Sequence, residues 1–274
     1  MKLGLALSGG AAYGYAHLGV LRVLEKYGIK PDIITGTSVG SLVGGGIASG
    51  FTAEEFIKLA LDLKWTDIAS LTIPKEGLVD LEKLEQYINK HFKVKKIQDT
   101  KIKFAAVVTD LVTAKGKIIK EGPIAPAIRA SCSIPGIFTP AVIGGNLFVD
   151  GGVIDNLPVE AAREMGADFV IAVDVLAGNR TDITTHRDVF NLLWRSWQVA
   201  IMNIERFKEG KDGAADYTIT PEIVGVGPFD IHKKEDLINF GERSAEKLAP
   251  ELIKILNEKG SFMGMIKSIF TRQL

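Results

Sequence analysis

Ser38 has the local setting that a nucleophilic serine needs, at the centre of the pentapeptide Gly36-Thr37-Ser38-Val39-Gly40 between a predicted strand and a predicted helix. A sharp strand-to-helix turn requires small residues two positions before and after the serine, because larger side chains would collide with neighbouring elements. The hydroxyl then lies near the first amides of the helix, which favour developing negative charge. The alternative is a glycine-rich turn in which Ser38 only caps the helix. The pentapeptide alone leaves both interpretations open.

Asp150 is the best-placed acid, since it ends a predicted strand at residues 147–149 and precedes Gly151 and Gly152. A carboxylate followed by two glycines can reach into a cleft with little steric cover. An Asx-turn, which is common at strand ends, is the alternative.

A third segment, residues 8–14, follows the predicted strand Leu3–Leu7 and reads SGGAAYG. A dinucleotide-binding loop would need glycine where Ala11 stands and an acid after the second strand, whereas Asp32 precedes that strand. Exposed loop amides could instead form an oxyanion hole. Taken alone, the segment indicates a tight turn.

The four histidines offer a weak case for a catalytic triad. His17 falls among apolar residues of the first predicted helix, which predicts a buried structural side chain. An α/β-hydrolase triad could formally combine Ser38 and Asp150 with His186 or His232, in the required chain order. Neither histidine lies in a motif that recommends it.

The elements around these residues alternate between strand and helix over the first 175 positions. Further strands are predicted at residues 32–35, 104–109 and 169–175, and this alternation favours an α/β fold with helices on both faces of the sheet. Beyond residue 180 the pattern changes to helices, the longest predicted at residues 186–209.

Three blocks together resemble the patatin-like phospholipase family in order and spacing. They are GGAAYG at residues 9–14, GTSVG at residues 36–40 and DGG at residues 150–152. Further similar segments are AHLGVL at 16–21, RASCSIP at 129–135, NLPV at 156–159 and GAD at 166–168. The resemblance covers about residues 3 to 175.

The resemblance implies a three-layer α/β/α sandwich with a mostly parallel central sheet, followed by C-terminal helices. It also implies a Ser–Asp dyad without histidine, with Ser38 as nucleophile and Asp150 as base, and chemistry that needs neither metal nor cofactor. The remaining residues carried over by position are the oxyanion-hole amides of Gly9, Gly10 and Ala11 and the supporting glycines Gly14, Gly36, Gly40, Gly151 and Gly152.

Two positions depart from the family pattern. Ala11 replaces the usual middle glycine, and its methyl group could demand a different backbone angle. Tyr13 replaces a frequent basic residue and so removes one contact to a phosphate head group. These changes affect the expected head-group preference more than the expected catalysis.

The leading hypothesis is a serine carboxylic-ester hydrolase that acts on lipids, of the phospholipase A or lysophospholipase type. The alternative is a non-catalytic lipid-binding or scaffolding protein that retains the fold; the departures at Ala11 and Tyr13 favour it, whereas the intact Ser38 and Asp150 oppose it. A nucleotide-binding domain is the third and weakest reading.

The composition of the chain limits the classes of partner and the cell compartment that we expect. The 274 residues carry 33 basic and 33 acidic side chains, so no net charge gathers nucleic acid or anionic lipid from a distance. Cys132 is the only cysteine, so no internal disulfide can form and a reducing compartment fits. Without an export signal or a span-length apolar run, we expect a cytoplasmic protein that binds lipid esters, peripherally at the inner membrane surface.

The C-terminal residues 251–274 are predicted as a helical segment distinct from an acyl hydrolase domain at residues 1–250. A helix at residues 250–258 should stop at Gly260, so that the tail, residues 261–274, orients independently. The tail carries an apolar helical stripe formed by Phe262, Met265, Ile266, Ile269 and Phe270. This stripe predicts contact with a membrane surface, with docking on the same chain or pairing in a homodimer as alternatives.

Two other segments each allow two interpretations. Residues 90–103 hold six lysines, which indicate a solvated face ahead of an anionic-membrane contact. Residues 65–79 read as an apolar loop, which could be a lid, although packing against the core is commoner.

Overall fold

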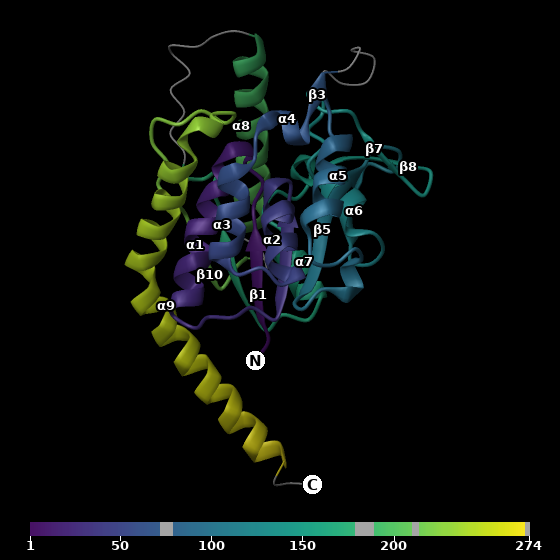
Figure 1. Cartoon of the computed structure of the whole chain (residues 1–274). Helices are drawn as coiled ribbons and strands as arrows, with labels where there is room; N and C mark the ends of the chain where they lie inside the picture. The colour runs from purple at the N-terminus through teal and green to yellow at the C-terminus, as the bar shows by residue number, and fades with distance from the viewer. Residues whose placement is uncertain (72–78, 179–188, 210–213, 272–274) are drawn as a thin grey trace.

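The computed structural model describes residues 1–71, 79–178, 189–209 and 214–271 (Figure 1). Within these residues an eight-stranded sheet has the order β10-β9-β1-β2-β5-β8-β7, with β6 paired to β5. The parallel strands are β1 (Leu3–Leu7), β2 (Ile33–Thr37), β5 (Lys103–Asp110), β9 (Phe169–Val173) and β10 (Tyr217–Ile219). The antiparallel strands are β6 (Lys115–Ile119), β7 (Ala141–Ile143) and β8 (Asn146–Asp150).

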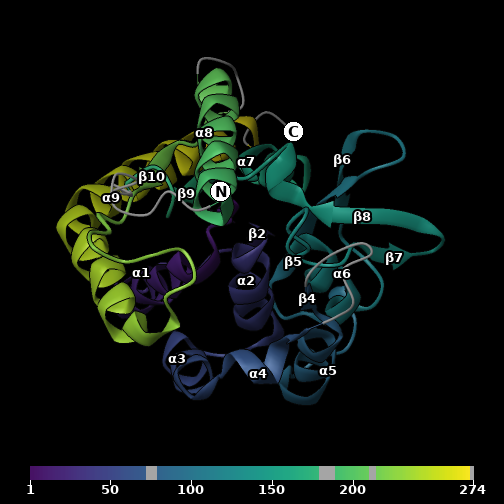
Figure 2. The ribbon, with the colours of Figure 1, turned by 90° about the horizontal axis from the view of Figure 1, so that it is seen from above.

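Helices cover both faces of this sheet, as Figure 2 shows from above. On one side lie α1 (Tyr15–Lys26), α2 (Val39–Ser49), α3 (Ala53–Asp62), α5 (Glu82–His91) and α6 (Ile124–Ser131). On the other lie α7 (Val159–Glu164) and α8 (Val189–Glu209). Strand alternation divides the core accordingly, because Leu5 and Leu7 belong to the apolar cluster under α2 while Ala6 packs with Val159 of α7. The expected three-layer sandwich with a mostly parallel sheet is confirmed.

The predicted strands are present with small changes at their ends, whereas three strands of the sheet, β6, β7 and β10, had no prediction. β6 carries Lys115 and Lys117 in place of an apolar run, and β10 has only three residues. The long predicted helix corresponds to α8, and residues 186–188 lie outside the described residues. The apolar segment at residues 65–79 contains α4 (Trp65–Ile68), β3 (Ser70–Leu71) and the first residue of β4 (Val79–Asp80), with residues 72–78 outside the described ones.

The predicted ends of the C-terminal helix, at Pro250 and before Gly260, are wrong, because α9 (Lys234–Thr271) continues through both residues. Gly260 has no left-handed backbone angle, and a glycine inside a helix costs only about 1 kcal/mol. Packing on α1 stabilises the first half of α9, where a side chain at Gly241 would overlap the backbone of Ala16. The proposed division of the chain at residue 250 falls inside this helix and remains a prediction.

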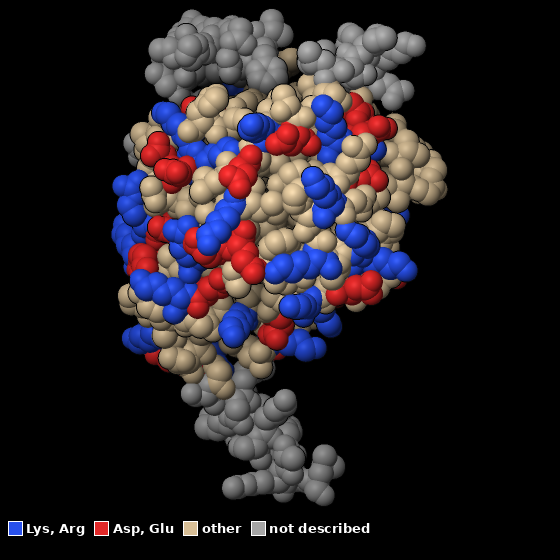
Figure 3. Space-filling view, in the orientation of Figure 1, with Lys and Arg blue, Asp and Glu red and all other residues tan. Residues whose placement is uncertain are grey.

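Charges are mixed over the face in Figure 3, with blue and red side chains interspersed. All six lysines of residues 90–103 are exposed, as a solvated face requires, and Lys93 pairs with Glu55 at 2.7 Å. Among the described residues, no helix combines the length and apolar character that crossing a membrane would take.

Candidate active site

Ser38 occupies a strained turn between β2 and α2, with φ +53° and ψ −130°. A Cβ at Gly36 would overlap the backbone of Gly40, and one at Gly40 would overlap the carbonyl of Leu7. The two glycines are therefore required by close backbone contacts. The Ser38 side chain makes no capping hydrogen bond to α2, so the interpretation as a simple helix cap is wrong.

Two other serines hold the backbone of this turn. The hydroxyl of Ser131, at the end of α6, accepts from the Ser38 N–H (2.8 Å) and donates to the Val107 carbonyl (2.6 Å). The hydroxyl of Ser41 donates to the Ser38 carbonyl (2.6 Å). Ser131 lies in the RASCSIP segment that resembles the family. The hydrogen bonds that Ser131 makes to the turn, however, depend on α6 packing beside β5.

Asp150 is fully buried at the end of β8, and its N–H donates to the Ser133 carbonyl (2.8 Å). Its Oδ1 accepts from the Gly152 N–H (2.8 Å), which is the Asx-turn considered from the sequence. Its Oδ2 has no hydrogen bond of standard geometry in the described part of the chain. The Asx-turn thus fixes one oxygen of the carboxylate and leaves the other unpaired.

Burial raises the pKa of Asp150 to about 7, although the Ser38 hydroxyl and the Gly152 N–H both lower it. Ser38 is therefore close enough to stabilise the carboxylate without forming an aligned hydrogen bond. Loose geometry of this kind is common between a nucleophile and its base in the absence of substrate. A pKa near 7 suits a group that must accept a proton and return it at neutral pH.

The loop after β1 lies directly beside Ser38, since a Cβ at Gly9 would stand 3.1 Å from the Ser38 Cβ. The Gly9 N–H donates to the Asn156 carbonyl (3.1 Å), so this amide is already used. The amides of Gly10 and Ala11 have no acceptor among the described residues. Ala11 adopts φ +49°, the left-handed region that a glycine would enter without strain.

The burial and hydrogen bonds of His17 and Tyr13 indicate structural roles for both residues. His17 is fully buried, its Nε2 lies 2.9 Å from the Ser8 carbonyl, and burial lowers its pKa to about 4. The ring is thus neutral and braces the loop after β1, as its apolar neighbours predicted. Tyr13 is also buried, and its hydroxyl donates to the Val226 carbonyl (3.2 Å).

The structure gives no histidine to the candidate dyad within the described residues. His17, His91 and His232 make no hydrogen bond to Ser38 or Asp150, and His186 lies outside the described residues.

Helix α8 contributes a set of hydrogen bonds and an ion pair to the site that the sequence pattern did not indicate. Glu205 Oε1 accepts from the Asn156 N–H (2.9 Å), and Lys208 Nζ lies 2.7 Å from Asp155 Oδ1. The Asp155 carbonyl in turn accepts from the Thr37 hydroxyl (2.8 Å). These bonds tie the loop after Asp150 to α8 and to the residue before Ser38.

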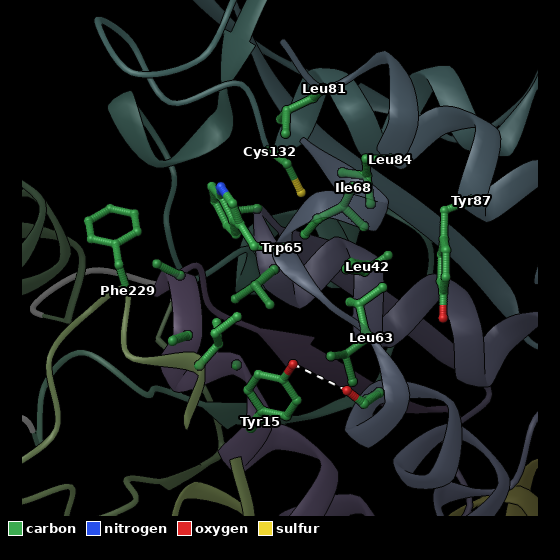
Figure 4. Close-up of a pocket in the computed structure, with 18 of the residues that line it drawn as sticks. Tyr15, Leu42, Leu63, Trp65, Ile68, Leu81, Leu84, Tyr87, Cys132 and Phe229 are labelled. Atoms are coloured by element: carbon green, nitrogen blue, oxygen red, sulfur yellow. Dashed lines mark hydrogen bonds between the residues drawn. The ribbon is translucent and has the colours of Figure 1, made fainter. Parts of the chain in front are cut away.

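An apolar cavity opens beside Ser38 and contains about 1140 Å³ of empty space, part of it open to solvent (Figure 4). Its walls come from α2, α3, α4, α5 and the segment before α9. They include Leu42, Phe56, Trp65, Ile68, Leu84 and Phe229. The Tyr15 hydroxyl, drawn with a dashed line in Figure 4, donates to the Ala60 carbonyl (3.3 Å) and ties α1 to α3. A cavity of this lining suits a hydrocarbon chain.

Comparisons with known proteins indicate the family of this chain. A family model described as "Patatin-like phospholipase" matches residues 5–163. The chain is 32% identical over 206 residues to "Patatin-like phospholipase domain-containing protein 6" of Homo sapiens, covering 72% of this chain and 15% of that protein. It is 29% identical over 274 residues to "Lysophospholipase NTE1" of Scheffersomyces stipitis, covering 90% of this chain and 18% of that protein.

The chain therefore spans less than a fifth of the length of these two relatives. Among solved structures, VipD from Legionella pneumophila is similar with a TM-score of 0.50 and 15% identity, covering 91% of this chain and 67% of that one. At this identity the likeness concerns the fold alone.

Proposed function

Because this chain belongs to the patatin-like phospholipase family, we propose that it hydrolyses acyl esters of lipids, of the phospholipase A or lysophospholipase type, with Ser38 and Asp150 as its dyad. The observation that carries the proposal is the pairing of a strained serine with a buried carboxylate whose Oδ2 is unpaired. Ser38 also lines an apolar cavity that could take the acyl chain.

In the acylation step the Ser38 hydroxyl attacks the ester carbonyl carbon, and its proton passes to Asp150 Oδ2. The amides of Gly10 and Ala11 donate to the oxyanion of the tetrahedral intermediate, each such donor being worth about 3–4 kcal/mol. The intermediate collapses, the bond to the alcohol breaks, and Asp150 returns the proton to the leaving oxygen.

In the deacylation step water attacks the acyl-Ser38 ester while Asp150 accepts one of its protons. Collapse of the second intermediate releases the fatty acid, and the proton goes back to the Ser38 oxygen. The enzyme is then restored with no net change in its protonation, as catalysis requires.

The test uses Ser38→Ala and Asp150→Asn with a chromogenic butyrate ester and a lysophospholipid. Each variant should lose hydrolysis by more than about a thousandfold, as is usual for removal of a nucleophile or its base. Exposed Ser196 on α8 supplies the matched control Ser196→Ala, which should keep wild-type rates. Full activity in either dyad variant would refute the mechanism.

A fluorophosphonate probe separates the enzyme from a non-catalytic lipid-binding protein. Modification of Ser38 in the wild type, lost in Asp150→Asn, supports catalysis. Vesicle binding with neither labelling nor hydrolysis would favour the lipid-binding alternative.

We also propose that the tail, residues 261–274, holds the enzyme peripherally at a lipid surface. The backbone of α9 stays helical to Thr271, so the apolar spacing of the sequence falls on a helix. Deleting the tail should weaken binding to anionic vesicles while butyrate hydrolysis continues. Unchanged vesicle binding would contradict this role, and a truncation that converts a dimer into a monomer would assign the tail to subunit pairing.

A further inference from the structure

We propose that Tyr87 closes the far end of the apolar cavity and sets the longest acyl chain that the enzyme accepts. The inference rests on the proposed hydrolase function and adds a residue that determines specificity.

A row of aromatic rings joins one side of the cavity to the loop after Asp150. Trp197 Cζ2 lies 3.4 Å from the position of a Cβ at Gly152, two residues from Asp150. The Trp197 ring is 5.2 Å from Trp194, which is 5.0 Å from Phe229 in the cavity wall. Figure 4 shows Phe229 and Tyr87 on opposite sides of the lining. Tyr87 therefore lies across the cavity from the aromatic row that reaches the loop after Asp150.

Tyr87 separates two hollows of opposite character. Together with Leu59 and Leu63 it lines both the apolar cavity and a second hollow on the surface. The rest of the second hollow is polar. Its other residues are Asp62, Asp67, Lys83, Gln86, Lys90 and His91. The Tyr87 ring, with the two leucines, thus forms the wall between hydrocarbon space and charged surface.

The Tyr87 side chain is held in place by two contacts, one at its hydroxyl and one at the face of its ring. Its hydroxyl donates to the Leu59 carbonyl on α3 (3.4 Å), and its face stacks on His91 at 4.3 Å between centroids. Burial and the charges of Asp67 and Asp62 raise the pKa of Tyr87 to about 12, so the hydroxyl remains a donor at neutral pH. A wall with two anchors resists displacement by the end of a chain.

The consequence is a cut-off in chain length. Each methylene that enters the apolar cavity should improve kcat/KM by about fourfold, the value of one buried methylene. Once the terminal methyl reaches Tyr87, further carbons must displace the ring or enter the polar hollow, and the gain stops.

The experiment measures kcat/KM for chromogenic esters from butyrate to palmitate with the full chain. Tyr87→Ala should raise the ratio of the longest to the shortest ester by about tenfold or more, because the two hollows join. Tyr87→Phe keeps the ring and should keep the wild-type cut-off. Leu63→Trp fills the same end and should move the cut-off to shorter chains.

Gln86→Ala is the matched control, since Gln86 is the preceding residue on α5 and lines only the polar hollow. Its chain-length profile should equal that of the wild type. Tyr87→Leu, which removes the ring but keeps an apolar side chain, gives a second variant if Tyr87→Ala unfolds.

A folded Tyr87→Ala or Tyr87→Leu variant with an unchanged profile, or with one that changes equally at every length, would overturn the inference. A wild type that hydrolyses no ester would instead refute the proposed function, and this inference with it.

Discussion

The turn at Ser38 and the cavity beside it differ in what holds them in shape. At the turn, backbone touches backbone, so that a single methyl group at Gly36 or Gly40 has no room. In the cavity, side chains from segments distant in the sequence meet at ring distances such as the 6.1 Å between the centroids of Trp65 on α4 and Phe138 before β7. Side chains can rotate away from an added group, whereas a strand and a helix cannot. The turn should therefore tolerate almost no substitution, while the cavity should respond with changes in substrate preference.

Gly40→Ala should have the largest effect. Its methyl group would push α2 away from the Leu7 carbonyl and displace Ser38, and a shift of about 1 Å costs roughly a hundredfold in rate. The control is Gly116→Ala in β6, where the nearest atom to a new Cβ is 3.5 Å away. Activity of Gly40→Ala within a fewfold of the wild type would mean that the turn is as adaptable as the cavity.

The titration of Asp150 should govern both activity and stability. If Asp150 is the base, as proposed, its pKa of about 7 means that kcat/KM should fall about tenfold for each pH unit below 7. Because the folded-state pKa is raised above the ordinary 3.8, the native state binds this proton more tightly than the unfolded chain. Stability from this group is therefore greatest below pH 4 and declines by about 4 kcal/mol as pH rises to 7.

Asp150→Asn should remove the loss of stability that the Asp150 carboxyl group causes as pH rises from 4 to 7. Its Tm should exceed the wild-type Tm at pH 8, and the difference should shrink towards pH 4. The measurement is thermal unfolding across this pH range beside the pH profile of kcat/KM. Equal pH dependence of Tm in both proteins would show that the carboxyl group is not the titrating site.

Trp65→Ala tests the cavity. The side chain is 39% exposed and lines the cavity, so its loss should reduce kcat/KM for long-chain esters by about tenfold with a smaller effect on butyrate. Val142→Ala, at an exposed position of β7 outside the cavity, is the control. An equal loss for short and long esters would assign Trp65 to catalysis or folding in place of chain binding.

Ala11→Gly should have the smallest effect. Relief of the left-handed backbone angle should raise the free energy of unfolding by about 1–2 kcal/mol. The greater freedom of glycine in the unfolded chain should offset about 0.5–1 kcal/mol of this increase. Ala114, with φ +54° in the turn after β5, is the matched control. Both variants should be slightly more stable, but only Ala11→Gly should alter kcat, because only Ala11 lies in the loop beside Ser38.

Prediction from the sequence succeeded where the determining contacts are local. The spacing of Gly36 and Gly40 predicted the turn, and two glycines after Asp150 predicted an acid on a tight bend. His17 was predicted to be buried from its apolar neighbours, and it is. The continuation of α9 through Gly260 was missed, because helix ends depend on tertiary packing as well as on local propensity.

The sequence by itself determined the α/β alternation and the sharp turn at Ser38, since these follow from side-chain periodicity and from steric limits within a few residues. Only the tertiary structure decided that Asp150 is buried beside Ser38, that Ser131 braces the turn and that Tyr87 divides two hollows. Burial, and hence the raised pKa of Asp150, depends on what neighbouring elements cover. A cavity is likewise the space left between helices that are distant in sequence, so its length is fixed only when those helices pack together.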